Sequence, residues 1–320
     1  MKVTKNIIYI LLIILLSFAL PRIIPGNPLS LTEGELHILN LNLPEDTYNV
    51  FKEYYAPEKP IGEQFVIYIK HLLNFDLGYS FYYRMPVSRL IAGRIGWTVF
   101  LSLSSIIISS LIGIPLGLNR AIGKEKKANN FIIGFLASIQ ALPSFLVAIL
   151  FQLIFCFRIE IFPSSGAYTP GIELFSNGFI VDVLFHAFIP LLTLVFLEIP
   201  SIFLLTYNSA LKIKDENYVE MAHYLNMDDK RIKYDYIFHN SLPEVLSKVN
   251  IQCLYAISGT LFVETVFSYP GMGSLLKVAA TSSDYSLLQG ILLIVGIYGM
   301  FINIIFKIII KNIDPRFENG

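Results

Sequence analysis

The chain has 320 residues, of which 54% are hydrophobic and only 15% are charged, and its formal net charge is zero. Soluble globular domains usually carry about a quarter charged residues, so this composition excludes an ordinary water-soluble protein. The balanced charge, without a long basic tract, argues against a nucleic-acid partner. The two cysteines, Cys156 and Cys253, lie inside apolar segments without CxxC spacing, which predicts small core residues rather than a disulfide or a thiolate metal site.

Apolar segments long enough to cross a membrane recur along the chain. Breaking the chain where charged residues, Pro, Gly and Asn cluster predicts six transmembrane helices, at 6–24, 97–119, 131–157, 184–210, 246–267 and 285–310. The first segment follows Lys2 and Lys5 as a signal peptide would, but Pro21 and Pro25 stand where small residues would mark a cleavage site, so we expect a retained anchor. The sequence therefore predicts an all-α, multi-pass protein of the cell membrane.

Four parts follow from these spans: a first transmembrane helix (1–25), an external segment (26–96), a five-helix core (97–310) with a cytoplasmic loop (212–246), and a cytoplasmic tail (311–320). Lys and Arg follow the second, fourth and sixth spans and precede the first, so both termini are predicted to be cytoplasmic. The external segment is expected to form a small subdomain. Its apolar residues at helical spacing predict an amphipathic helix and are Phe65, Ile69, Leu72 and Leu73.

Polar side chains inside the apolar spans are candidates for a solute pathway. Carboxylates there are functional by default, and Glu198 lies in the fourth span and Glu264 near the outer end of the fifth. A hydrogen bond between helices is an equally weighted alternative for Glu198, and an interfacial position is the alternative for Glu264. The other candidates, for which bonding between helices is the simpler interpretation, are Gln140, Ser144, Asn250, Gln252, Ser258 and Thr260.

No G-x-x-x-x-G-K-[ST] motif occurs, so the chain is predicted to be no enzyme and to need a partner for any ATP hydrolysis. A stand-alone secondary transporter, the alternative class, would be expected to have interrupted helices in two repeated halves, and no such repeat is visible. The five histidines have no pair at metal-ligand spacing, so the sequence predicts no metal or other cofactor bound by this chain.

The cytoplasmic loop is too patterned for a linker. Asn226 stands where a short helix should end, because Asn tolerates the left-handed conformation of a helix C-terminus. Asp228 is expected to cap the next helix by accepting a backbone N–H bond, and Pro243 is expected to end it. The loop is thus either a docking element or an amphipathic surface feature. The apolar stripe at i, i+3, i+4 and i+7 of the first helix is Tyr218, Met221, Ala222 and Leu225.

Motifs follow one another in a definite order. Residues 216–222 read Glu-Asn-Tyr-Val-Glu-Met-Ala, residues 239–243 read His-Asn-Ser-Leu-Pro, and residues 263–273 read Val-Glu-Thr-Val-Phe-Ser-Tyr-Pro-Gly-Met-Gly. Pro-Gly-Asn-Pro stands at 25–28 and Asp-Pro-Arg at 314–316. In this order they resemble the EAA loop and flanking elements of ABC importer permeases of the oligopeptide, dipeptide and nickel group. The departures from that pattern are Met221, Asn226, Tyr207 and Asn27.

The resemblance implies a permease subunit that moves its substrate by alternating access. The implied partners are a second, similar permease, two cytosolic ATPases that bind ATP and magnesium, an external substrate-binding protein, and membrane lipid. Di- or oligopeptides are the favoured substrate, and nickel or a metal chelate is the alternative. Ala222 would allow close approach of the ATPase, and Glu220 would pair with an arginine there. The implied coupling residues are Tyr218, Glu220, Met221, Ala222, Leu225 and Asn226.

Overall fold

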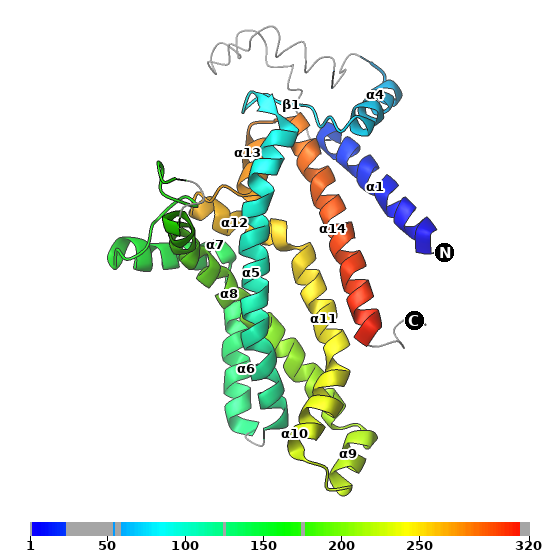
Figure 1. The fold of residues 1–320 in the computed structure, drawn as a ribbon, viewed down its shortest axis with the longest axis vertical. Coiled ribbons are helices and arrows are strands. Elements are labelled where there is room, and N and C mark those ends of the chain that lie inside the picture. The colour runs from blue at the N-terminus through cyan, green and yellow to red at the C-terminus, as the bar shows by residue number, and fades with distance from the viewer. Residues whose placement is uncertain (1, 24–53, 55–58, 124–125, 174–176, 314–320) are drawn as a thin grey trace. The chain divides into compact units, whose positions relative to one another are not determined.

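The computed structural model describes residues 2–23, 54, 59–123, 126–173 and 177–313. These residues are mostly helical, as predicted; the strands among them are β1 (Tyr79–Ser80) and β2 (Met85–Pro86), an antiparallel pair (Figure 1). The chain divides into unit 1, residues 1–96 and 271–300, and unit 2, residues 97–270 and 301–320. The motifs at 25–28 and 314–316, and most of the external segment before 59, lie outside the described residues.

Among the described residues, three helices are long and apolar enough to cross a membrane: α5 (Val87–Ile122), α8 (Asn177–Lys214) and α14 (Tyr285–Ile313). Helix α1 (Lys2–Ile23) matches the first predicted span, although its apolar part is shorter. The remaining two predicted spans are bent helix pairs. By length and composition the described residues contain up to five candidate spans, so the count of six and the orientation stay predictions.

The third predicted span is not one helix. Helix α6 (Lys126–Gln140) and helix α7 (Ser144–Phe151), which continues into the π-helix η1 (Gln152–Arg158), meet at an angle of 94°. Pro143 gives the reason, because a residue before proline avoids the helical conformation and Pro143 itself is extended, with ψ of 132°. The prediction of a single helix over 131–157 is therefore wrong at this point.

Pro243 corrects a second prediction, because it lies inside α11 (His239–Leu254) and does not end a helix. Helix α10 (Asp229–Arg231) leads through the π-helix η2 (Ile232–Phe238) directly into α11. Two residues before the proline, the Ser241 hydroxyl donates a hydrogen bond to the carbonyl of Phe238 over 2.9 Å. The helix breaks later, at Tyr255, and α12 (Ala256–Val266) follows.

In unit 1, the predicted amphipathic helix of the external segment is present as α4 (Ile61–Leu73). It packs on α1, where the ring of Phe18 lies edge-on to Phe65, with 5.1 Å between ring centroids. The hydroxyls of Ser17 and Tyr68 form a buried hydrogen bond of 2.9 Å beside it. Helix α4 is therefore attached to α1.

The hairpin of unit 1 is held by one carboxylate. Asp284, between α13 (Met272–Thr281) and α14, is almost fully buried and accepts a hydrogen bond from the hydroxyl of Ser80 in β1. It also accepts the backbone N–H groups of Tyr82 (3.2 Å) and Leu287 (3.1 Å). A single side chain thus joins the hairpin to the first turn of α14.

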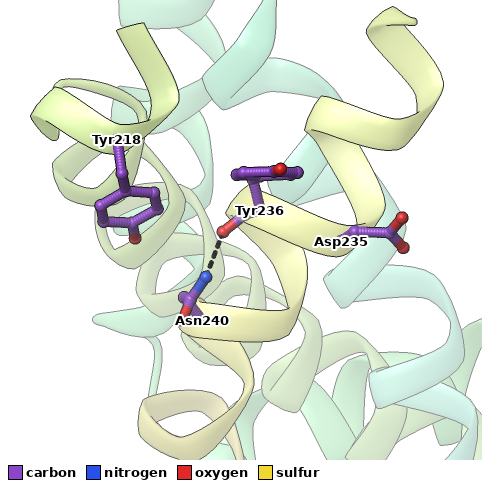
Figure 2. Close-up of a pocket in the computed structure, with 4 residues that line it drawn as sticks. All are labelled: Tyr218, Asp235, Tyr236 and Asn240. Carbon is purple, nitrogen blue, oxygen red and sulfur yellow. Dashed lines mark hydrogen bonds between the residues drawn. The ribbon is translucent and has the colours of Figure 1, made fainter. Parts of the chain in front are cut away.

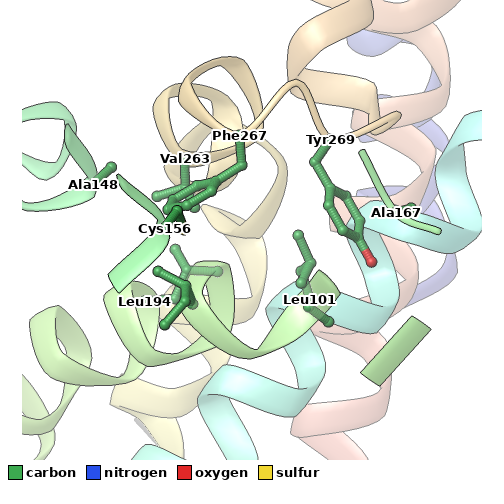
Figure 3. Close-up of a cluster of buried hydrophobic side chains, with 10 residues drawn as sticks. Leu101, Ala148, Cys156, Ala167, Leu194, Val263, Phe267 and Tyr269 are labelled. Atoms are coloured by element: carbon green, nitrogen blue, oxygen red, sulfur yellow. The ribbon is translucent and has the colours of Figure 1, made fainter. Parts of the chain in front are cut away.

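Unit 2 has an aromatic and aliphatic core around the loop that precedes α8 (Figure 3). Tyr269 and Phe267 are its largest fully buried side chains. Both cysteines are buried and free, which confirms the prediction that they are core residues. The core residues are Leu101, Ala148, Cys156, Ala167, Ala187, Ile189, Leu194, Val263, Phe267 and Tyr269.

Two glycines allow α5 and α8 to approach closely within unit 2. A Cβ on Gly117 would lie 2.7 Å from the carbonyl oxygen of Phe203, and a Cβ on Gly113 would lie 3.1 Å from Cβ of Ile202. Small residues four positions apart are a common basis for helix packing in membranes, where close backbone contact replaces the hydrophobic driving force.

We expect Gly117→Val to destabilise the protein by about 1–3 kcal/mol, because the new side chain must push against the backbone of α8. The matched control is Gly134→Val on α6, where an added Cβ meets nothing within 4 Å. Thermal unfolding in detergent, followed by size-exclusion chromatography, measures both. Equal melting temperatures for the two variants would contradict the close packing of α5 on α8.

Candidate functional site

The 212–246 loop begins with α9 (Asn217–Tyr224) and lies at one end of unit 2, opposite α12 (Figure 1). Asn226 follows α9 with φ of 52°, which confirms the predicted left-handed conformation. Its N–H bonds the carbonyl of His223 over 3.0 Å, and the N–H of Met227 bonds the carbonyl of Ala222 over 3.2 Å. These two bonds are the Schellman pattern of a helix C-terminus, so the turn out of α9 is well defined.

Asp228 occupies the N-cap position of α10, as predicted, but its side chain makes no capping hydrogen bond. The chain enters α10 through a backbone bond, from the N–H of Ile232 to the carbonyl of Asp228 over 3.0 Å. Because Asp228 is exposed, water can satisfy the first amides of the helix. The predicted capping bond is therefore wrong, although the helix start is right.

Two lysines fix the loop to the end of α5. Lys214 donates hydrogen bonds to the carbonyl oxygens of Ala121 (3.2 Å) and Ile122 (3.4 Å), and Lys233 donates one to the side-chain oxygen of Asn119. A cation at this position interacts favourably with the negative end of the α5 dipole. The C-terminal ends of α5 and α8 therefore lie together at this end of unit 2.

One side of α9 is buried against the loop's own core. Val219 is fully buried and Ala222 is 2% exposed. This corrects the prediction that Ala222 belongs to an exposed contact stripe, because its side chain faces inward. The core that covers it comes from α5, α8 and η2 and consists of Leu118, Ala121, Ala210, Ile232 and Ile237.

The opposite side of α9 is apolar and faces solvent. Met221 is 63% exposed and Leu225 is 66% exposed. Glu220 accepts a hydrogen bond of 3.0 Å from the hydroxyl of Tyr224, and this bond raises the pKa of Tyr224. Exposed apolar side chains gathered on one face commonly mark a protein contact. We call this face the α9 patch, and it consists of Tyr218, Met221, Tyr224 and Leu225.

A pocket of ≈ 280 Å³ adjoins this face (Figure 2). The ring of Tyr218 faces the side chain of Asn240, whose amide donates a hydrogen bond of 2.6 Å to the carbonyl of Tyr236. Asp235 also lines the pocket, but Figure 2 shows its carboxylate directed away from Tyr218. The pocket therefore has an aromatic wall and a polar floor.

The candidate pathway residue Glu198 lies on α8, and its side chain contacts α5. Its carboxylate accepts hydrogen bonds from the hydroxyls of Ser105 (3.2 Å) and Ser109 (3.1 Å). This is the bond between helices that the sequence left as the alternative to a pathway role. The pair of hydroxyls joins two helices that already pack closely through Gly113 and Gly117.

Glu264 is fully buried, so it does not occupy the interfacial position considered from the sequence. Its carboxylate accepts hydrogen bonds from the hydroxyl of Thr98 on α5 (2.7 Å) and from Thr260 on α12 (2.9 Å). Two of the candidate pathway residues, Thr260 and Glu264, are therefore brought together.

The other candidates are spread over unit 2. Gln140 and Ser144 lie on either side of the break between α6 and α7. The side-chain amide of Asn250 donates to the side-chain oxygen of Asn303 over 3.4 Å, and the Ser258 hydroxyl donates to the carbonyl of Tyr255. Gln252 is partly buried on α11. The structure therefore does not bring these candidate pathway residues together in one site.

Sequence reasoning missed Val219 and Met227, which hold α9 in place, and Tyr224, which enlarges the patch. Val219 and Ala222 lie three positions apart, so their spacing carried a signal for a second apolar face. No local rule decides which of two apolar faces is covered.

Comparison with known proteins agrees with this architecture. Residues 90–319 match the family model of the binding-protein-dependent transport system inner membrane component. A putative peptide transport system permease protein of Brucella abortus is 27% identical over 315 residues, covering 98% of this chain and 96% of the relative. The dipeptide transport system permease protein DppB of Escherichia coli is 24% identical over 324 residues, with 96% and 94% covered.

A solved structure with a similar fold is the MetNI methionine ABC transporter in an inward-facing conformation, with a TM-score of 0.57 and 13% sequence identity. The match covers 70% of this chain and 96% of that chain. Because the family model spans most of the sequence, from the first turns of α5 to the C-terminus, this chain belongs to the family of binding-protein-dependent transport system inner membrane components, the permease components of ABC importers.

Proposed function

We propose that this chain is the membrane subunit of an ATP-driven importer of di- or oligopeptides, and that two cytosolic ATPases move it between outward-open and inward-open states by pushing on the 212–246 loop. A second permease and an external substrate-binding protein complete the transporter. ATP and magnesium bind to the ATPases, so this chain is itself no enzyme. The peptide substrate rests on the names of the Brucella and Escherichia coli relatives.

The observation that carries the coupling role is the two-sided construction of α9. One side is fixed by Val219 and Ala222 in the loop core, and the other presents the α9 patch. A push on the patch therefore reaches α5 and α8 through packed side chains and through the Lys214 and Lys233 hydrogen bonds. A loop without this core would bend instead of transmitting the movement.

The test compares two charge substitutions on the same helix. Met221→Arg places a cation in the patch, whereas the control His223→Arg places one on an exposed position beside it. We expect Met221→Arg to lose at least about tenfold in ATPase co-purification and peptide uptake, because an unpaired charge is costly to desolvate. His223→Arg should retain both. Normal uptake by Met221→Arg would refute the docking role.

The orientation is testable with introduced cysteines. Asn74→Cys at the end of α4 is expected to react with a membrane-impermeant maleimide in intact cells, whereas Asp229→Cys in the loop should react only after permeabilisation. Both positions are exposed, and both native cysteines are buried. Reaction of Asp229→Cys in intact cells would contradict a cytoplasmic loop.

A further inference from the structure

Unit 2 has two distinct hydrophobic cores. One is the cluster around Tyr269 and Phe267, here called the aromatic core, and the other is the loop core that covers α9. Among the described residues, none belongs to both clusters. Helices α5 and α8 each run from one core to the other, and so does the segment formed by η2, α11 and α12. These three connections therefore link the loop core to the aromatic core.

Each connection is interrupted between the residue that it contributes to the aromatic core and the residue that it contributes to the loop core. The interruptions are Pro115 in α5, Pro200 in α8, and the 53° bend at Tyr255 between α11 and α12. Proline lacks the N–H that would bond the carbonyl one turn back, so helices bend there. The core residues on either side of the interruptions are, in the same order, Leu101 and Leu118, Leu194 and Ala210, and Val263 and Ile237.

Close contacts place the two prolines at the same level. A Cβ on Gly113, two residues before the proline of α5, would lie 3.3 Å from the carbonyl oxygen of Ile199. A Cβ on Gly117, two residues after that proline, would lie 2.7 Å from the carbonyl oxygen of Phe203. The turn of α5 that contains its proline thus packs on the turn of α8 that contains the other.

The third interruption lies near this level too. Glu198, two residues before the proline of α8, interacts electrostatically with Cys253, two residues before the bend that ends α11. The same carboxylate accepts the hydrogen bonds from Ser105 and Ser109 of α5. One side chain therefore ties α5 to α8 on the side of the prolines that faces the aromatic core.

We propose that Pro115, Pro200 and Tyr255 form a hinge, about which the loop core tilts relative to the aromatic core. This hinge rests on the proposed function, since the ATPases supply the push on α9. Each core moves as one body because its side chains are closely packed, whereas the hinge bends where backbone hydrogen bonds are missing. The Glu198 carboxylate makes α5 and α8 bend as a pair. The 94° break at Pro143 lets α6 follow α8 while α7 stays with the aromatic core.

Distances between spin labels test the hinge in the complete transporter, reconstituted with its ATPases. The pair across the hinge is Ile161→Cys, in the loop beside the aromatic core, and Asp229→Cys in α10. The reference pairs are Ile161→Cys with Ile180→Cys on the aromatic-core side, and Lys212→Cys with Asp229→Cys on the loop side. All four positions are exposed, and both native cysteines are buried.

We expect the distance across the hinge to differ by on the order of 5 Å between the nucleotide-free and the vanadate-trapped transporter, whereas both reference distances stay constant. Equal distances in a transporter that still takes up peptide would mean that unit 2 moves as one body. That result overturns the hinge and leaves the proposed function intact. A change within either reference pair would place the bending inside a core and also overturns it. Failure of the ATPases to bind the unmodified chain would contradict the proposed function, and the hinge with it.

Alanine variants test the prolines themselves. Pro200→Ala restores a backbone donor at the hinge, and the matched control Pro190→Ala restores one at a buried proline of the same helix, inside the aromatic core. We expect Pro200→Ala to lose at least about half of the nucleotide-driven change in distance and Pro190→Ala to keep it. Pro115→Ala should act as Pro200→Ala does, and because Pro115 is exposed it disturbs packing less. An undiminished change in both hinge variants, or an equal loss in the control, would overturn the hinge.

Discussion

Replacing Ala222 with Asp is expected to unfold the 212–246 loop and to abolish ATPase binding as a consequence. Ala222 is 2% exposed and packs with Val219 and Ile232, so a carboxylate there would be buried without a partner. Such burial costs at least about 3 kcal/mol, which exceeds what a short helix and its small core can absorb. Uptake and ATPase retention should fall together.

Hydrogen exchange separates this effect from a loss of docking alone. In Ala222→Asp, the amides of 217–238 should exchange at least about tenfold faster than in the unmodified protein. In Met221→Arg the same amides should remain protected although ATPase binding is lost, because Met221 is 63% exposed. Native protection in Ala222→Asp would mean that the loop core around α9 is not needed for its fold.

The sequence predicted α9 well where the rules are local. The end of the helix at Asn226 depends on one residue that tolerates φ of 52°, and the structure has this conformation. The buried side of α9 depends instead on what surrounds it. Val219 and Ala222 form one apolar face and Met221 and Leu225 another, and only the positions of α5 and η2 decide between them.

The effect of the two prolines on their helices likewise depends on the surrounding structure. Pro143 breaks a helix, whereas Pro243 lies inside one, after the π-helical turn of η2. Proline removes a backbone donor in both places, yet the helix breaks at Pro143, where ψ is 132°, and continues through Pro243. Such tertiary and side-chain detail is not contained in residue spacing.

The sequence predicted the family of the protein better than the contacts of single side chains, because the order of the motifs along the whole chain identifies the family. The family match over 90–319 confirms the resemblance to ABC importer permeases and removes the stand-alone secondary transporter that the sequence had left open. The role of Glu198 was harder to predict, since the sequence does not show which groups a carboxylate in a membrane span contacts. Its bonds to Ser105 and Ser109 depend on the packing of α5 against α8.

The hairpin of unit 1 is joined to the first turn of α14 through the carboxylate of Asp284. Burial raises the pKa of Asp284, and hydrogen bonds from the Ser80 hydroxyl and from backbone amides, including those of Tyr82 and Leu287, oppose this rise. The carboxylate is therefore stabilised by its donors and not by water. If it is removed, the buried Ser80 hydroxyl and the buried N–H of Leu287 lose their acceptor, and so does the partly buried N–H of Tyr82.

We expect Asp284→Ala to destabilise unit 1 by on the order of 3–5 kcal/mol, because the buried donors of Ser80 and Leu287 are left unpaired at about 1–3 kcal/mol each. Asp284→Asn should cost less, since it keeps one acceptor oxygen at nearly the same volume. Exposed Asp76, which accepts the N–H of Gly78 over 2.9 Å, provides the control Asp76→Ala in the same subdomain. Melting temperature in detergent and proteolysis between β1 and β2 measure the effect. If Asp284→Ala melts no earlier than Asp76→Ala, the hairpin is held by its backbone pairing and not by this carboxylate.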